Sequence, residues 1–151
     1  MKRTVRVWDD QSALEKAVMI YSGGTEVKNG IRYEFGFDPE GSIICRWQRV
    51  PNCSTERRTG SIKMVMLSSG VSDANGTAIY EGDILRISNE LLYADFLCTV
   101  TYHDGAFLLR DPQHKHYQED LRECCNDGIA MEVIGNVYET PYLIGRERRT
   151  L

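Results

Sequence analysis

Eight short runs rich in β-branched and aromatic residues, each with partial period-two alternation, constrain the fold most strongly. They are RTVRVW (3–8), IRYEFGFD (31–38), SIICRWQRV (42–50), IKMVML (62–67), DILRI (83–87), FLCTVTYH (96–103), AFLLR (106–110) and AMEVIGNVYE (130–139). Successive side chains along such a run point to opposite faces of a sheet. So many short runs predict a mainly β protein.

Turns and helices are predicted between these runs. Glycine, asparagine or aspartate can adopt the positive φ that tight turns need at Lys28–Gly30, Asp38–Gly41, Asp73–Gly76 and His103–Gly105. Helix signals predict one short helix over Asp10–Met19 and another over about Lys115–Cys125, closed by Asn126–Gly128.

The polar, turn-rich segment Pro51–Gly60 lacks apolar periodicity and is the predicted linker. It divides the chain into a β-rich N-terminal part (1–59), a β-barrel (60–145) and a basic tail (146–151). The predicted fold is therefore mainly β, with a small SH3-like or irregular β-barrel in the C-terminal half, a β-rich N-terminal part and one or two short helices. A length of 151 residues with 42% hydrophobic residues suffices for a packed core.

Charge and cysteine usage limit the class of protein. A net charge of −4 argues against a strongly basic nucleic-acid wrapper. No window reaches the roughly 18 apolar residues of a membrane span, and the N-terminus lacks the apolar core of a secretory signal. The five cysteines are odd in number and irregularly spaced, which favours free thiols over a disulfide framework. We therefore expect a cytoplasmic protein.

Cysteine and histidine residues supply two candidate chemical sites. Cys124 and Cys125, with His114 and His116 upstream, offer zinc-type ligands, but their spacing matches no established zinc pattern. Packed or surface cysteines are the favoured interpretation, and metal binding stays open. Cys98 with His103 forms a conceivable nucleophile–base pair, although the sequence alone does not bring the two side chains together.

The stretch Glu81-Gly82-Asp83, with Glu132, raises the question of a carboxylate site for hydrolysis or divalent metals. We favour a turn that feeds the strand from Ile84 to Ile87, with Gly82 at positive φ, Tyr80 and Ile84 buried, and both acids solvated. A phosphate loop at Gly76 is disfavoured because no helix N-terminus follows it. No catalytic residue, cofactor or metal ligand is assigned, and we expect no enzyme.

Three segments resemble a known family. Val65–Leu85 (VMLSSGVSDANGTAIYEGDIL) resembles the central signature of the YopX family of bacteriophage and prophage proteins, and Met131–Ile144 (MEVIGNVYETPYLI) is similar to its closing segment. Arg6–Asp9 is similar to the family's start. The signature positions in this chain are Gly70, Asp73, Asn75, Gly76, Ile79, Tyr80, Glu81, Gly82, Asp83, Ile84, Val133, Ile134, Gly135, Asn136 and Tyr138.

The resemblance implies a phage-encoded, mainly β protein with a compact barrel in its C-terminal half that assembles as a homo-oligomer. It implies no reaction, no cofactor and no catalytic residue. We therefore expect an accessory protein of the bacterial host cytoplasm, of unknown biochemical activity, whose partners are other copies of itself and a host or phage protein, with no membrane partner.

The alternative is a nucleic-acid-binding β-barrel. Local positive charge would come from Arg57, Arg58, Lys63, Arg146, Arg148 and Arg149, and base stacking from Tyr93 or Tyr102. Basic residues at a linker and a tail are more often solvated, and the overall charge is acidic. Nucleic acid is therefore a possible but disfavoured partner.

Overall fold

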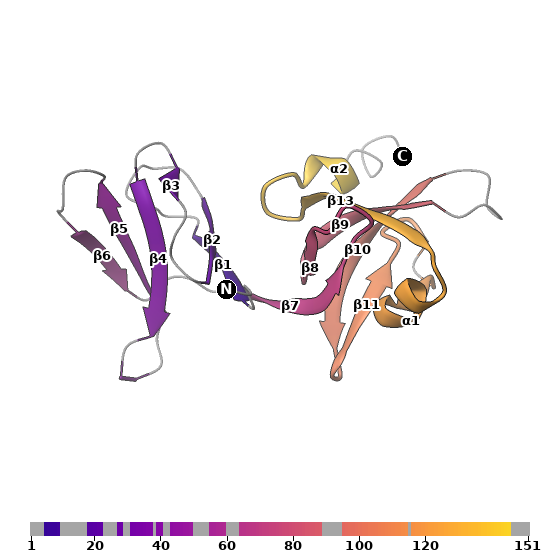
Figure 1. Ribbon diagram of the computed structural model, residues 1–151, viewed down its shortest axis with the longest axis horizontal. Helices are drawn as coiled ribbons and strands as arrows, with labels where there is room; N and C mark the ends of the chain where they lie inside the picture. The colour runs from indigo at the N-terminus through magenta and orange to yellow at the C-terminus, as the bar shows by residue number, and fades with distance from the viewer. Residues whose placement is uncertain are drawn as a thin grey trace. The chain divides into compact units, whose positions relative to one another are not determined.

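The computed structural model describes residues 5–9, 18–22, 27–28, 31–37, 39–40, 43–49, 55–59, 64–88, 95–114 and 116–145. They form thirteen strands and two short helices within two compact units, Met1–Leu67 and Ser68–Leu151 (Figure 1). The strands are β1 (Val5–Asp9), β2 (Val18–Tyr21), β3 (Val27–Lys28), β4 (Ile31–Phe37), β5 (Ile43–Arg49), β6 (Thr55–Thr59), β7 (Met64–Ser72), β8 (Ala78–Tyr80), β9 (Asp83–Ser88), β10 (Phe96–His103), β11 (Ala106–Arg110), β12 (Gln118–Asp120) and β13 (Ala130–Asn136). The helices are α1 (Leu121–Asn126) and α2 (Tyr142–Gly145).

In the N-terminal unit, four antiparallel strands follow the order β3-β4-β5-β6. β6 occupies part of the segment Pro51–Gly60 and pairs with β5 from Gln48 opposite Thr55 to Ile44 opposite Thr59. The linker interpretation was therefore wrong for these five residues. Because β6 is an edge strand, it needs no alternating apolar residues to be held in a sheet. The compact units divide between Leu67 and Ser68, inside β7, whereas the sequence placed a boundary between residues 59 and 60.

β1 lies between β2 and the first half of β7 in the same unit. Val18 and Met19, predicted as the end of a helix, belong to β2, so the helix prediction was wrong there; residues 10–17 lie outside the described part. The run VMIY is apolar throughout, and pairing it with β1 leaves Met19 3% and Ile20 2% exposed. Burial against a neighbouring strand overrides the helical pattern.

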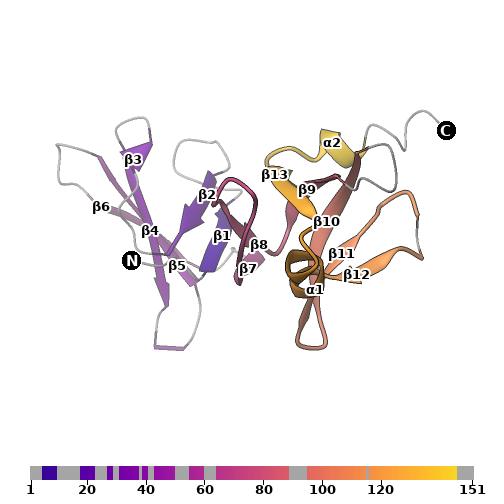
Figure 2. The same ribbon diagram turned by 45° about the vertical axis from the view of Figure 1, so that its right-hand side comes forward.

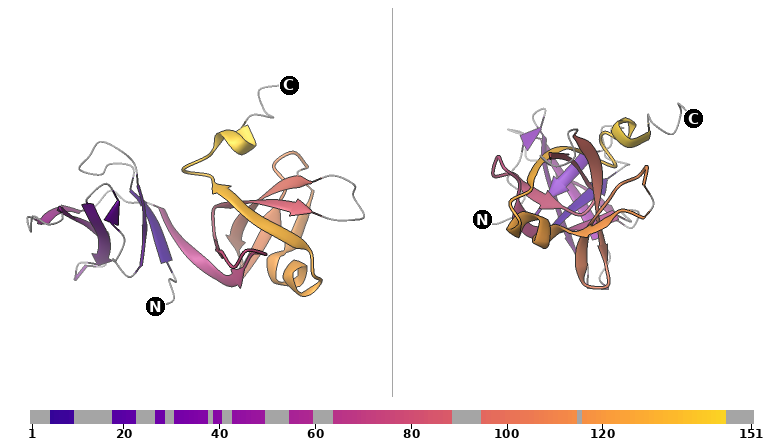
Figure 3. Two further views of the ribbon diagram at one scale, coloured as in Figure 1. Left: turned by 45° about the horizontal axis from the view of Figure 1, so that its top comes forward. Right: turned by 90° about the vertical axis from the view of Figure 1, so that its right-hand side faces the viewer.

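In the C-terminal unit, five antiparallel strands in the order β12-β11-β10-β9-β13 curl into a partly open, irregular β-barrel (Figures 1 and 3). The second half of β7 pairs with β8. The prediction of a mainly β protein with an irregular barrel in the C-terminal half and two short helices is confirmed. None of the helices among the described residues is long and apolar enough to cross a membrane.

The β10–β11 hairpin follows the sequence pattern closely. His103 pairs with Ala106 across a two-residue turn in which Asp104 has φ 50° and Gly105 φ 82°. Positive φ at both central residues matches the right-handed twist of the two strands. The turn predicted at His103–Gly105 is thus present and fixes the register of the whole hairpin.

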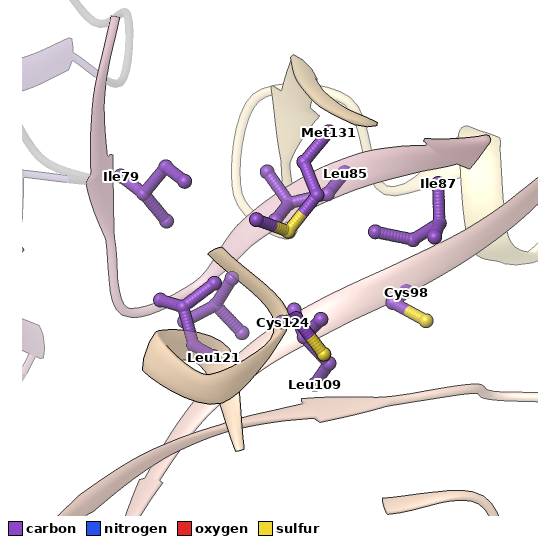
Figure 4. Packing of buried hydrophobic residues seen from close by; sticks show 9 residues of the cluster. Ile79, Leu85, Ile87, Cys98, Leu109, Leu121, Cys124 and Met131 are labelled. Atoms are coloured by element: carbon purple, nitrogen blue, oxygen red, sulfur yellow. The ribbon is translucent and has the colours of Figure 1, made fainter. Parts of the chain in front are cut away.

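The barrel core is built from alternate positions of the strands and one face of α1. Its buried members are Ile79, Leu85, Ile87, Cys98, Val100, Leu109, Leu121, Cys124 and Met131. Figure 4 shows eight of these labelled side chains gathered between the strands and the helix. Leu121 and Cys124 stand three apart, on the same side of α1, so one face of this short helix closes the core.

The second predicted helix is shorter than expected. Gln118–Asp120 form β12, which pairs with β11, and only the following residues are helical (Figure 2). The Asp120 side chain accepts a hydrogen bond from the Glu123 backbone N–H at 3.1 Å and so caps the helix. β12 pairs with the open edge of β11 and extends the sheet as far as Asp120. The Asp120 cap then defines where α1 begins.

Candidate functional site

Asp73 links two distant parts of the barrel. Its Oδ1 accepts hydrogen bonds from the backbone N–H groups of Asn75 (2.9 Å) and Thr77 (2.8 Å), which closes the turn between β7 and β8. Its Oδ2 accepts one from the Val133 N–H at 2.9 Å, on β13. The Ala74 N–H also donates to the Met131 carbonyl at 3.1 Å. The predicted Asp73–Gly76 turn therefore exists, with Gly76 at φ 80°, and it also covers the outer edge of β13.

The stretch Glu81-Gly82-Asp83 is a turn between β8 and β9. Gly82 has φ 87°, and Tyr80 and Ile84 are 3% and 0% exposed, so these three predictions are confirmed. The prediction that both acids are solvated was wrong for Asp83, which is 1% exposed. Asp83 Oδ2 accepts a hydrogen bond from the Tyr80 backbone N–H at 2.8 Å. A buried carboxylate is tolerated where it accepts a hydrogen bond, so Asp83 stabilises the turn from a buried position.

Gly82 joins the same turn to two other strands. Its N–H donates to the Val100 carbonyl of β10 at 2.8 Å, and its carbonyl accepts from the Val137 N–H at 2.9 Å, just after β13. One residue at positive φ thus connects the β8–β9 turn, β10 and the end of β13.

The closing segment forms a third corner. Asn136, 7% exposed, accepts hydrogen bonds on its side-chain oxygen from the N–H groups of Tyr138 and Glu139. Thr140 Oγ1 accepts from the Asn136 N–H at 3.0 Å. The β13–β9 register shifts between Val133 and Gly135, and a Cβ built on Gly135 would overlap Thr140 Oγ1. The chain turns here because position 135 has no side chain.

The remaining signature residues occupy supporting positions. Ile79 is fully buried in the core, Val133, Ile134 and Tyr138 are half-buried, and Gly70 has φ 81° within β7. The polar signature side chains of Asp73, Asp83 and Asn136 are thus directed at backbone groups of the barrel. Their geometry is that of a structural framework.

Asp83 and Glu132, two members of the disfavoured carboxylate site, lie apart. Glu132 forms an exposed salt bridge with Arg86 at 3.3 Å, and these two residues are opposite each other in the β13–β9 pairing. Asp83 lies opposite Asn136, at the other end of that pairing. Within the described ranges, no three His, Cys, Asp or Glu side chains are grouped so that they could hold a metal ion.

The cysteine and histidine candidates separate in the same way. Cys98 and His103 stand five positions apart on β10 and therefore face opposite sides; Cys98 is fully buried and the His103 side chain is 64% exposed. Burial raises the pKa of Cys98 to about 12 and that of Cys124 to about 11. Burial also raises the pKa of Cys125. A thiol kept protonated is a poor nucleophile and metal ligand.

Few of the candidate nucleic-acid contacts fall in the described part of the chain. Tyr102 is 43% exposed and packs on Phe107 with ring centroids 4.9 Å apart. Arg57 and Arg58 lie on β6, where only the backbone is described. Lys63, Tyr93, Arg146, Arg148 and Arg149 lie outside the described residues.

The barrel also carries a surface cavity of about 260 Å³, which was not among the predictions from the sequence. β7 contributes Ser69 and Val71, the β10–β11 hairpin contributes Gly105–Phe107, and the β12–α1 junction contributes Asp120–Arg122. Three segments far apart in the sequence meet there. The one sequence signal for it was Gly70, whose positive φ belongs to an irregular stretch of β7.

Comparisons with known proteins give a family match and similar solved structures. The family model described as YopX protein matches residues 6–145. The crystal structure of protein yopX from Bacillus subtilis is similar over 95% of this chain and 98% of that chain, with 19% identity and a TM-score of 0.59. A crystal structure from Enterococcus faecalis is similar over 95% of this chain and 99% of that chain, with 22% identity and a TM-score of 0.49. Comparison with curated proteins finds no match.

Proposed function

The chain belongs to the YopX family, and from this premise we propose that it is a phage- or prophage-encoded accessory protein that acts as a homo-oligomeric protein-interaction module and not as an enzyme. The observation that supports this most is the use of Asp73, Asp83 and Asn136. Their side chains bond backbone N–H groups of the barrel. An acid–base catalyst would instead present such groups to a substrate.

Exposed apolar side chains support self-association. On β7, Val65 and Leu67 are each 40% exposed, whereas Met66 between them is 2% exposed. In the C-terminal unit, Tyr102 is 43% and Tyr142 59% exposed. An apolar stripe along one strand face, in a protein built from short strands with open edges, favours association with another chain.

Charge favours a protein over nucleic acid as the partner of the barrel. Residues 68–145 contain 13 acidic and 4 basic residues. This excess of acidic residues disfavours phosphates, because nucleic-acid binding depends on neutralising them with lysine and arginine. The nucleic-acid alternative would depend on the basic tail or the N-terminal unit.

Light scattering on the purified chain tests the self-association. We expect a mass corresponding to two or more copies at micromolar concentration. Replacing Val65 and Leu67 together by threonine should lower that mass, because threonine keeps the strand preference but removes apolar surface. Circular dichroism of the variant controls for loss of fold. A wild-type mass equal to one chain would contradict the proposal.

A further inference from the structure

We propose that the cavity of about 260 Å³ on the barrel receives one apolar side chain from a basic segment of a partner protein. This inference rests on the proposed function as an interaction module, and it identifies where on the barrel the contact is made and the chemistry of the segment that makes it.

An irregular stretch of β7 forms one wall. Ser68 pairs with Tyr80 and Ser72 with Ala78, so β7 spans four steps where β8 spans two. Two extra residues therefore bulge out of the sheet. The Gly70 N–H donates to Ser68 Oγ at 3.3 Å and the Val71 N–H to Ser69 Oγ at 3.2 Å. The serine hydroxyls of the bulge already accept hydrogen bonds from these two N–H groups. This wall therefore offers a partner protein a complementary shape and apolar surface more than hydrogen bonds.

The apolar part of the lining suits an apolar side chain. Val71, Phe107 and Leu121 belong to this part, and Val71 and Phe107 also pack against the core. Ser69, Asp120 and Arg122 contribute polar side chains to the same lining. The ring of Tyr102 contacts Phe107 at a tilt of 59° and continues the apolar surface along the hairpin. The volume is below the roughly 300–1,000 Å³ of pockets for small-molecule ligands. A single anchoring side chain fits a space of this size, in the way that buried anchors fill pockets at protein interfaces.

The rim determines the charge of the partner segment. Asp120 lines the cavity, and its neighbours Glu119 and Glu123 are exposed. The Asp104 side chain, beside Gly105, is 88% exposed, and its Oδ2 lies 3.2 Å from His103 Nε2. Among the described residues of this rim, Arg122 is the one arginine or lysine. Complementary charge steers association, so lysine or arginine residues should flank the anchor.

Two synthetic peptides test the proposal. Each has a central leucine, flanked on both sides by two lysines in one peptide and by two glutamates in the other. Each is added to the full-length ¹⁵N-labelled chain, and backbone amide shifts are followed by NMR. We expect the lysine peptide to shift the amides of Val71, Gly105 and Phe107, and to bind more weakly as salt increases. Serine in place of the central leucine should weaken binding about tenfold or more.

Charge variants of the protein provide the matched comparison. Asp104→Asn removes a rim charge, and asparagine also tolerates the positive φ at that position, so the turn should persist. We expect it to weaken binding of the lysine peptide by about two- to fivefold. Glu132→Gln removes the same charge beside Arg86, away from the cavity lining, and should leave the affinity unchanged.

Equal or tighter binding of the glutamate peptide, shifts that map elsewhere, or no shifts with either peptide would overturn the inference. These outcomes are separate from the oligomer test. An oligomeric mass without peptide binding removes the cavity proposal alone, and a monomeric mass with the expected shifts removes self-association alone.

Discussion

Replacing Asp73 by alanine is expected to lower the free energy of unfolding by about 3 kcal/mol, because hydrogen bonds to a charged group contribute about 1.5–3 kcal/mol each and a buried donor left without a partner adds a penalty. The carboxylate receives the N–H groups of Asn75, Thr77 and Val133. The first two can turn to water, since Asn75 and Thr77 are exposed. The Val133 N–H connects the turn to β13, and the loss of its partner has the larger effect on the free energy of unfolding. Urea unfolding measures the change.

Asp73→Asn is the control that separates charge from connectivity. The amide oxygen can still accept from Asn75 and Thr77, but the amide NH₂ would face the Val133 N–H, so two donors would meet. About half of the alanine effect is therefore expected. A loss of less than 0.5 kcal/mol, the range of ordinary surface substitutions, in both variants would contradict the structural role of Asp73.

Gly135→Ala is the second substitution with a large expected effect. The added methyl group would overlap Thr140 Oγ1 and lie 3.1 Å from Leu143 Cδ1. Thr140 would have to move, and its bonds to the Asn136 N–H and carbonyl would be lost. We expect a destabilisation of about 2–3 kcal/mol, as for overpacked interiors, measured as a shift in the urea midpoint.

Gly36→Ala is the matched control, because Gly36 also lies within a strand and a Cβ there has open space. A double-mutant comparison identifies the cause. Gly135→Ala should cost less in a Thr140→Ala background, since the overlapping hydroxyl is absent. If the cost is unchanged by Thr140→Ala, steric overlap with Thr140 is not the reason that position 135 requires glycine.

Local patterns in the sequence were sufficient for the central hairpin of the barrel. FLCTVTYH and AFLLR predict β10 and β11 with the bounds that the structure has, because alternation and an Asp104-Gly105 turn act within a few residues. The strand runs also predicted a barrel in the C-terminal half, and the family resemblance implied the same and supplied the signature positions.

Properties that depend on distant parts of the chain were not predictable. The contact between Asp73 and Val133 joins residues 60 positions apart, and neither residue type indicates the other. Asp83 was expected at the surface because acids in turns usually are, yet it is 1% exposed at the start of β9, where it pairs with Asn136 of β13. Residues 118–120 were likewise predicted as part of a helix. These three polar residues form the strand β12 because they pair with the open edge of β11.

The cavity was missed on similar grounds. Val71, Phe107 and Leu121 are far apart in the sequence and line one cavity only in the folded chain, beside the irregular stretch of β7. The available signal was Gly70, three residues beyond the predicted strand run 62–67, because an isolated glycine in a strand often marks a bulge.

The central claim is that the polar signature residues hold the barrel together, and native-state hydrogen exchange of the unmodified chain tests it most directly. The amides of Tyr80, Gly82, Val133 and Val137 donate to Asp83, Val100, Asp73 and Gly82, respectively. We expect these four amides to exchange only through global unfolding, far more slowly than those at the exposed tip of the Asp104-Gly105 turn. Exchange of the four as fast as at that tip, while the rest of the barrel stays protected, would contradict the claim.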